Sequence, residues 1–495
     1  MMKIRVVKTA SQAKAVQVVR YQNNKRVVLR HLGSAHTQEA LNDLLSLAEQ
    51  WIKDYSEQLS IFPDENPNTL LHLNYCTFMG VKYHFFYNQM HLIQEKIGFD
   101  NLPLLLRDLV TIRIFEPASK LRSLELMNQF FSVNHSRKVY YKIALKCIEL
   151  KETVERKVVD FAKANYAFNF DILFYDVTTL YFETFDQDDL RNNGFSKDNK
   201  SQQPQILVAL MVTKEGFPVA YEIFPGNTFE GHTIIPAVKD FIQRHKVKAF
   251  TIVADAAMIS TENIKQLVEN NINYIVGARL GNISAKLLEI IDKSIRRQDG
   301  RSIRIKTDNG SLICSYSAVR YRKDLYEMNK QIEKAKQVIE KPSKGRKLKF
   351  TTTNGQNIEL NDKLIEKTKK LLGIKGYYTN LDQSTMDNKT IIERYHELYK
   401  IEQAFRISKS DLQTRPIFHF KEQPIKLHIL ICFMALVVSK HIELTTGVSI
   451  RKFKDESKKI VDGQILNQIS NKMVTIKAKP TDKMKEILLK LFAPH

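Results

Sequence analysis

The sequence is poor in several residue types, and each shortage excludes a class of protein. Only 4 of the 495 residues are cysteines, at positions 76, 147, 314 and 432, and no two of them form a C-x-x-C pair. This usage excludes a disulfide framework and a zinc-finger spacing, and it predicts reduced, mostly buried thiols. With 17 Gly and 13 Pro, the chain is neither collagen-like nor Pro-rich.

Long apolar runs are also missing. A membrane-spanning helix needs about 20 apolar residues. The most apolar stretch, Ile429 to Val438, is bracketed by Lys426, His428 and Lys440. We therefore expect a buried core helix there. The N-terminal residues carry positive charge without an apolar segment, which predicts no secretory signal. The expectation is a cytoplasmic protein without a membrane partner.

Acidic residues are scarce relative to basic ones. The chain has 76 Lys and Arg against 54 Asp and Glu, a net charge of +22. A protein that binds neutral metabolites does not need so large a positive net charge. Nucleic acid is the expected partner, because binding to its backbone depends on many Lys and Arg contacts. An anionic membrane surface is the second alternative.

The hydrophobic pattern changes period along the chain. The first thirty residues hold 8 Lys or Arg and no acid, in short β-prone runs that predict a basic hairpin. Helical spacing follows at 37–60 and again from about 85 to 168. From 171 to 280 the order is strand, strand, strand, helix, strand, helix. That order is a mixed α/β plan of the RNase H type.

These patterns predict a fold class and a division into domains. The fold class is an RNase H-like α/β core, a mixed sheet flanked by helices, with an inserted lysine-rich subdomain and a helical N-terminal region preceded by the hairpin. The domains are a basic β-hairpin plus helix at 1–60, a helical DNA-binding domain at 61–168, the core at 169–280 and 377–440, the insertion at 281–376, and a basic tail at 441–495.

Three carboxylates interrupt the expected core elements. Asp176 lies within an apolar and β-branched strand, and Asp255 directly follows the strand 251–254. Glu402 lies on a helix expected from about 391 to 408, on or beside the face that packs toward the sheet. A buried carboxylate must be neutralised, paired or bound to a cation. Oxygen ligands of this kind suit Mg²⁺, with Mn²⁺ as a substitute, and two such ions can catalyse phosphodiester hydrolysis.

Each carboxylate also has an ordinary interpretation. A single Asp in or after a strand is more often a turn former, a cap or an ion-pair partner, and Glu402 could belong to a solvated helix face. The joint arrangement on two strands and one helix, in a chain of +22, favours a metal site.

The sequence resembles the DDE transposases of bacterial insertion sequences that carry a Tyr-Arg-Glu-Lys signature, often called the IS-four superfamily. The resemblance covers about 171 to 440. The motifs that carry it are Phe174-Tyr175-Asp176-Val177-Thr178-Thr179, Pro225-Gly226-Asn227 with Glu230-Gly231-His232, Ile252-Val253-Ala254-Asp255, and YHELYKIEQAFRISKSDL from Tyr395 to Leu412.

The resemblance implies a role for each matching position. Asp176, Asp255 and Glu402 would be the catalytic residues and the ligands of two Mg²⁺ ions. Tyr395 and Lys409 would hold the transposon end, and Arg406 and Arg415 are plausible phosphate contacts. The Arg of the signature is replaced by Leu398, where we expect a position on the same helix face, tolerant of arginine. Arg394 or Lys400 could substitute for that cation.

The function implied is a DNA transposase that cleaves the terminal repeats of an insertion sequence and joins them to target DNA. Its partner would be double-stranded DNA, bound by a homodimer. Two alternatives stay open from the residues alone. One is a catalytically inactive repressor derived from a transposase, and the other is an RNase H-like nuclease that cuts without joining. The terminal-repeat sequence, the target preference and the excision route are not readable.

Overall fold

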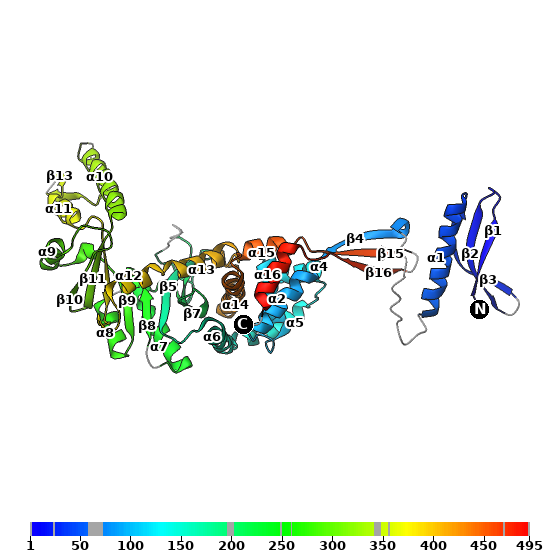
Figure 1. The fold of residues 1–495 in the computed structure, drawn as a ribbon, viewed down its shortest axis with the longest axis horizontal. Helices are drawn as coiled ribbons and strands as arrows, with labels where there is room; N and C mark the ends of the chain where they lie inside the picture. The colour runs from blue at the N-terminus through cyan, green and yellow to red at the C-terminus, as the bar shows by residue number, and fades with distance from the viewer. Residues whose placement is uncertain are drawn as a thin grey trace. The chain divides into compact units, whose positions relative to one another are not determined.

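The computed structural model describes residues 2–22, 25–57, 73–195, 202–247, 250–258, 260–340, 348–354, 357–468 and 471–493 (Figure 1). The chain divides into two compact units. The first contains Met1–Tyr87, Gln129–Ser132 and Glu456–Met484, and the second contains Asn88–Asn128, Val133–Asp455 and Lys485–His495. Every candidate site residue lies in the second unit.

The N-terminal sheet of the first unit has three antiparallel strands and one covering helix. The strands are β1 (Met2–Lys8), β2 (Lys14–Gln22) and β3 (Lys25–Ala35), and the helix is α1 (Gln38–Glu57). Val16 and Val18 of β2 pack against leucines of α1. The sequence predicted a two-stranded hairpin; the additional strand was missed because the β1–β2 turn contains neither Gly nor Pro. Gln12 instead adopts φ of 58° there.

A second small sheet in the first unit joins distant parts of the sequence. Its strand order is β16-β15-β4, with β4 at Cys76–Lys82, β15 at Asp462–Asn467 and β16 at Lys472–Lys477. The predicted tail at 441–495 therefore contributes two strands, and the predicted helical domain at 61–168 contains β4. Pairing between segments this far apart leaves no signal in local periodicity.

Helices occupy most of the chain between β4 and the central sheet. They are α2 (His84–Lys96), α3 (Leu104–Phe115), α4 (Lys120–Phe131), α5 (Arg137–Ile148) and α6 (Lys151–Tyr166); near the end of the chain follow α15 (Ile450–Ser457) and α16 (Asp482–Phe492). The helix α14 (Glu422–Thr446) packs against α3, α5 and α6 of the same unit.

Helix α14 is long and apolar enough to cross a membrane. Its most apolar 18-residue window has a mean hydropathy of 1.8, but 94% of that window is buried inside the protein. The helix is longer than the stretch 429–438 that drew attention in the sequence. Its burial agrees with the expected core helix.

An eight-stranded mixed sheet forms the centre of the second unit. The order is β10-β11-β14-β9-β8-β5-β6-β7. β5 pairs in parallel with β8, and β8 pairs in parallel with β9, while the other neighbours are antiparallel. The strands are β5 (Ile172–Tyr181), β6 (Gln205–Thr213), β7 (Pro218–Pro225), β8 (Thr251–Ala254), β9 (Asn273–Ala278), β10 (Ser302–Thr307), β11 (Gly310–Tyr316) and β14 (Ile374–Thr379).

Helices flank this sheet. The chain connects its strands through α7 (Ile234–His245), α8 (Thr261–Glu269) and α9 (Ala285–Ser294), and returns through α12 (Asn388–His396) and α13 (Tyr399–Ser410). α12 contacts β8 and β9, α13 contacts β5 and β6, and α14 contacts β7. Strands covered in this way are buried along their length, which explains the continuous apolar runs of β6 and β8. The predicted mixed sheet flanked by helices is confirmed.

Part of the predicted insertion belongs to the central sheet. β10 and β11 lie within 281–376, but β11 pairs antiparallel with β14, from Ser311 opposite Thr379 to Tyr316 opposite Ile374. A further part forms a lobe of α10 (Ala318–Glu340), β12 (Thr351–Asn354), β13 (Asn357–Leu360) and α11 (Asp362–Lys370). This lobe has its own core, which includes Met328, Phe350 and Ile365.

A buried basic cluster lies at the start of α14. Lys120 Nζ is 3.2 Å from His428 Nδ1, and His428 Nε2 is 2.9 Å from the carbonyl oxygen of Thr414. Since a carbonyl oxygen can only accept, Nε2 carries the proton and Nδ1 accepts from the lysine. Burial lowers the pKa of His428 well below its usual range, with Lys120 and Arg113 contributing. Burial also lowers the pKa of His419 to about 4.

We predict that acid weakens the fold through these histidines. The unfolded chain binds a proton at His419 near pH 6.5, whereas the folded protein binds it only near pH 4, so the free energy of unfolding falls as pH drops through this window. Urea unfolding between pH 7 and 4.5 should show a shallower loss in His419→Asn than in the parent. His36→Asn, at an exposed position, should keep the parental slope. Equal slopes for parent and His419→Asn would contradict the assignment.

Candidate active site

Asp176 and Asp255 are brought together by the parallel pairing of two strands. Tyr175 of β5 lies opposite Ala254 of β8. The next residues along both strands are the two aspartates, so they occupy the same row. In parallel strands about 4.8 Å apart, residues opposite each other point to the same face. Asp176 is half-buried and Asp255 is exposed.

The row continues across two further strands. Ala254 lies opposite Val276 of β9, so that Asp255 falls beside Gly277, and Gly277 lies opposite Tyr377 of β14. Gly277 is the only one of these positions without a side chain. A β-carbon there would stand 2.5 Å from the hydroxyl oxygen of Tyr395. The glycine therefore makes room for a side chain that descends from α12 onto the sheet.

Tyr395 uses this room to contact Asp255. Its ring is buried, with 6% of its surface exposed, and packs edge-on against Tyr377 at 4.9 Å between centroids. Its hydroxyl donates to Asp255 Oδ1 over 2.9 Å, and the same oxygen accepts from the backbone N–H of Ala256. Burial, followed by the charge of Asp255, raises the pKa of Tyr395. The tyrosine thus stays a proton donor that fixes the orientation of one carboxylate.

The helix expected at about 391–408 is two helices. α12 begins after Asp387, whose side chain accepts from the Thr390 N–H, so the helix begins three residues before the expected position 391. α12 ends at His396, and α13 begins at Tyr399 after a break. Leu398 lies at this break with 8% of its surface exposed. The expected position on one continuous helix face is therefore wrong, and the burial of the leucine argues against tolerance of arginine there.

The two cations expected to compensate for Leu398 are engaged elsewhere. Arg394 contacts Glu397 at 2.9 Å, and Lys400 contacts another oxygen of the same carboxylate at 3.0 Å. Lys400 also donates to the carbonyl oxygen of Lys214. Both charges are therefore held beside the helix break.

Glu402 lies in the first turn of α13 and is exposed. Glu402 and Asp255 both affect the pKa of the same residue, Lys375 of β14. Burial and Arg320 lower the pKa of Lys375, while the charges of Asp255 and Glu402 oppose this shift. Both carboxylates also act on Tyr395. Asp255 and Glu402 therefore both act on the charge states of Lys375 and Tyr395 and belong to one electrostatic neighbourhood.

The donor set has the chemistry that Mg²⁺ or Mn²⁺ prefers, since all three groups are carboxylates and two of them share a row. Within the described ranges, however, no three His, Cys, Asp or Glu side chains stand close enough together to hold an ion. The residues thus fit a divalent cation by type and by neighbourhood. Their assignment as ligands stays a prediction.

The predicted DNA contacts lie along and after α13. Arg406 is exposed and Lys409 is half-buried in the last turns of the helix. Arg415 follows in the loop before α14, with its guanidinium 5.7 Å from the Tyr181 ring centroid. Sequence reasoning missed Lys375 and Gly277, for which the only signal is a lysine and a glycine within otherwise apolar strands.

Comparison with known proteins identifies one family. The family model described as "Transposase DDE domain" matches residues 168–438. No curated protein matches the chain. A solved structure, "Cryo-EM structure of piggyBac transposase synaptic complex with hairpin DNA (SNHP)", shares 11% identity at a TM-score of 0.36, with 83% of this chain and 70% of that chain covered. A likeness this loose carries no argument about function.

We predict that Gly277→Ala destabilises the protein by about 1–3 kcal/mol, because its β-carbon collides with the Tyr395 hydroxyl. Tyr395→Phe removes that oxygen, so the double variant should cost less than the sum of the two single variants. Part of the cost should remain, since Ala256 also lies 3.1 Å from the added carbon. Denaturant unfolding measures all three. Gly281→Ala, which meets nothing within 4 Å, is the control, and strict additivity would show that Tyr395 is not the obstacle.

We also predict that Leu398→Arg lowers the free energy of unfolding by roughly 2 kcal/mol or more, because a guanidinium would replace a buried leucine. Tyr399→Arg, at a neighbouring position that is 50% exposed, should stay within about 0.5 kcal/mol of the parent. Thermal or urea unfolding distinguishes the two. Equal stability of Leu398→Arg and the parent would place residue 398 at the surface.

Proposed function

The chain belongs to the family of transposases with a DDE domain, and we propose that it is a DNA transposase of a bacterial insertion sequence, of the IS-four type. It binds the terminal repeats of its element, cleaves the ends by phosphodiester hydrolysis and joins them to target DNA. The observation that carries this proposal is the row in which Asp176 and Asp255 lie side by side, with Glu402 in the same electrostatic neighbourhood.

The catalytic core in this proposal is RNase H-like, and Asp176, Asp255 and Glu402 are the ligands of two Mg²⁺ ions. When bound, such ions supply the charge that activates an attacking hydroxyl and stabilises the leaving oxygen of a phosphodiester. Tyr395 holds Asp255 in one orientation through its hydrogen bond. The contact of Tyr395 with the transposon end, implied by the resemblance, stays a prediction.

DNA is the proposed partner, in the form of element ends and target. The charge of +22 supports this, since electrostatic attraction to phosphates supplies much of the affinity of a DNA-binding protein. Lys409, Arg406 and Arg415 contact the DNA backbone, and the helices α2 to α6 and the basic N-terminal sheet supply further DNA contacts. The proposal includes a homodimer on DNA and a cytoplasmic location.

The experiment is a cleavage and binding assay on duplexes that carry the inverted repeats flanking the gene. We predict that Asp176→Asn abolishes Mg²⁺-dependent cleavage while DNA binding stays within a few-fold of the parent, because one ligand is lost and the distributed Lys and Arg contacts remain. Asp255→Asn and Glu402→Gln should behave alike, and Mn²⁺ should replace Mg²⁺ in the parent.

Asp171→Asn is the matched control, since this aspartate precedes the same strand but lies at its other end. It should cleave normally. Undiminished cleavage by Asp176→Asn would remove that residue from the site. A parent that binds the repeats but never cleaves them would favour the repressor alternative, and cleavage without joining would favour the nuclease.

A further inference from the structure

Lys375 occupies a position that the assigned roles do not explain. It is the only charged residue of β14, and it is half-buried. Two residues further along the strand is Tyr377, which belongs to the row of Asp255 and Gly277. Since residues i and i+2 of a strand face the same side, Lys375 stands on the face that carries the carboxylates.

Its contacts bring the ammonium group to the candidate site. Lys375 Nζ lies 4.5 Å from the centroid of the Tyr395 ring and 5.6 Å from that of Tyr377. The hydroxyl of the same Tyr395 binds Asp255. A single tyrosine thus separates the lysine from one of the proposed ligands, and the charges of Asp255 and Glu402 reach it.

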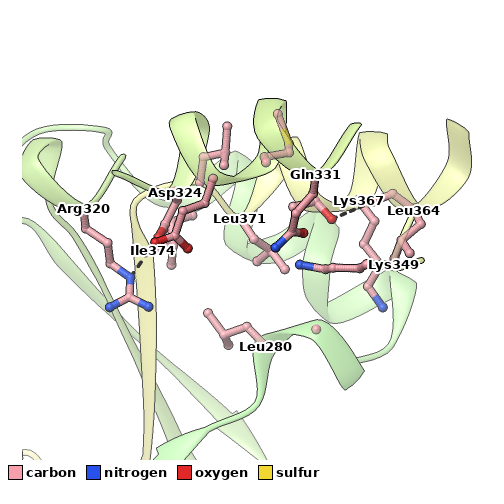
Figure 2. Close-up of a pocket in the computed structure, with 14 residues that line it drawn as sticks. Leu280, Arg320, Asp324, Gln331, Lys349, Leu364, Lys367, Leu371 and Ile374 are labelled. Atoms are coloured by element: carbon pink, nitrogen blue, oxygen red, sulfur yellow. Dashed lines mark hydrogen bonds and ion pairs between the residues drawn. The ribbon is translucent and has the colours of Figure 1, made fainter. Parts of the chain in front are cut away.

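A second cation lies next to this lysine. Arg320, near the start of α10, is exposed and contacts Asp324 at 3.4 Å. Figure 2 shows it beside β14 close to Ile374, the residue before Lys375. Arg320 and Ile374 also line a cavity of about 280 Å³ in the inserted lobe, together with Lys349 and Lys367. Asp324 and Glu327 line the same cavity, so among its charged residues only Arg320 is tied to Lys375 by its charge.

The positive charge of Lys375 is only partly balanced by its surroundings. Burial and the charge of Arg320 both disfavour the protonated ammonium group. Asp255 and Glu402 offset this repulsion, but in the proposed function both carboxylates are committed to cations. An additional anion at this position would then be strongly attracted, and the proposed substrate is a polyanion.

We propose that Lys375 binds a backbone phosphate of the DNA strand that lies over the carboxylates. The lysine supplies from the sheet a cation that position 398 cannot supply, because Leu398 is buried at the helix break. The inference rests on the proposed function for the identity of the ligand. Its own observations are the strand face, the ring contacts and the neighbouring Arg320.

The test measures DNA binding rather than cleavage. Affinity for the terminal-repeat duplex is measured with Ca²⁺ in place of Mg²⁺, so that the carboxylates hold a cation, from about 50 to 200 mM salt for the parent, Lys375→Met, Lys375→Gln and Lys375→Arg. Loss of one phosphate contact should reduce the slope of log affinity against log salt by about one in the Met and Gln variants. Lys375→Arg, which keeps the charge, should retain the parental slope.

Lys265→Met is the charge-matched control. This exposed lysine of α8 faces Glu269 at 3.9 Å and is not on β14. Its slope should equal that of the parent. Melting temperatures are recorded for every variant, so that loss of the cation–π contacts with Tyr395 and Tyr377 can be separated from loss of a phosphate contact.

A parental slope in Lys375→Met and Lys375→Gln would overturn the proposal. So would an equal loss of binding in all three variants that follows a fall in melting temperature, since that result assigns the lysine a purely structural role. Failure of the proposed function is a different outcome: Asp176→Asn would then cleave, or the parent would not, while the slope difference at position 375 could still be measured.

Discussion

The parallel hydrogen bonding of β5 to β8 is the constraint on which the candidate site depends. Because Tyr175 is fixed opposite Ala254, the two aspartates that follow must share a row. A register shift of one residue would turn one of them to the other face of the sheet. The two aspartates are therefore positioned by the backbone pairing of two buried strands, with Asp255 directly after the end of β8. Helices then add the remaining groups from above.

Gly277 allows the helices to approach. The row across the four strands contains Asp176, Asp255, Gly277 and Tyr377. Tyr395 of α12 occupies the space above Gly277, where a side chain is missing. This contact connects the sheet to the helix that precedes α13. After the break that follows His396, Leu398 is buried and Glu402 lies in the first turn of α13. The leucine is therefore part of what positions Glu402.

The sequence predicted β5 to β8 and the aspartates in or after two of them, because a carboxylate among apolar and β-branched residues is visible locally, but it did not predict β9, β10 and β11. It also located Glu402 on a helix above the sheet. It could not reveal the helix break, since apolar residues at 395, 398 and 405 fit one continuous helix equally well. It could not find Lys375, because only the pairing of β14 with β9 brings that strand to the site. The pairing of β4 with β15 was not predicted for the same reason, since it joins distant parts of the sequence.

The sheet β16-β15-β4 also constrains how the protein can be made. During synthesis, β4 leaves the ribosome long before β15, its only neighbour within the described sheet, has been translated. Until then, the backbone N–H and C=O groups of β4 have no partner strand, and Phe78 and Met79 remain exposed. A product that stopped before residue 462 would keep the whole row of carboxylates yet carry an open, apolar strand edge. Premature termination would thus yield a chain prone to aggregation through β4.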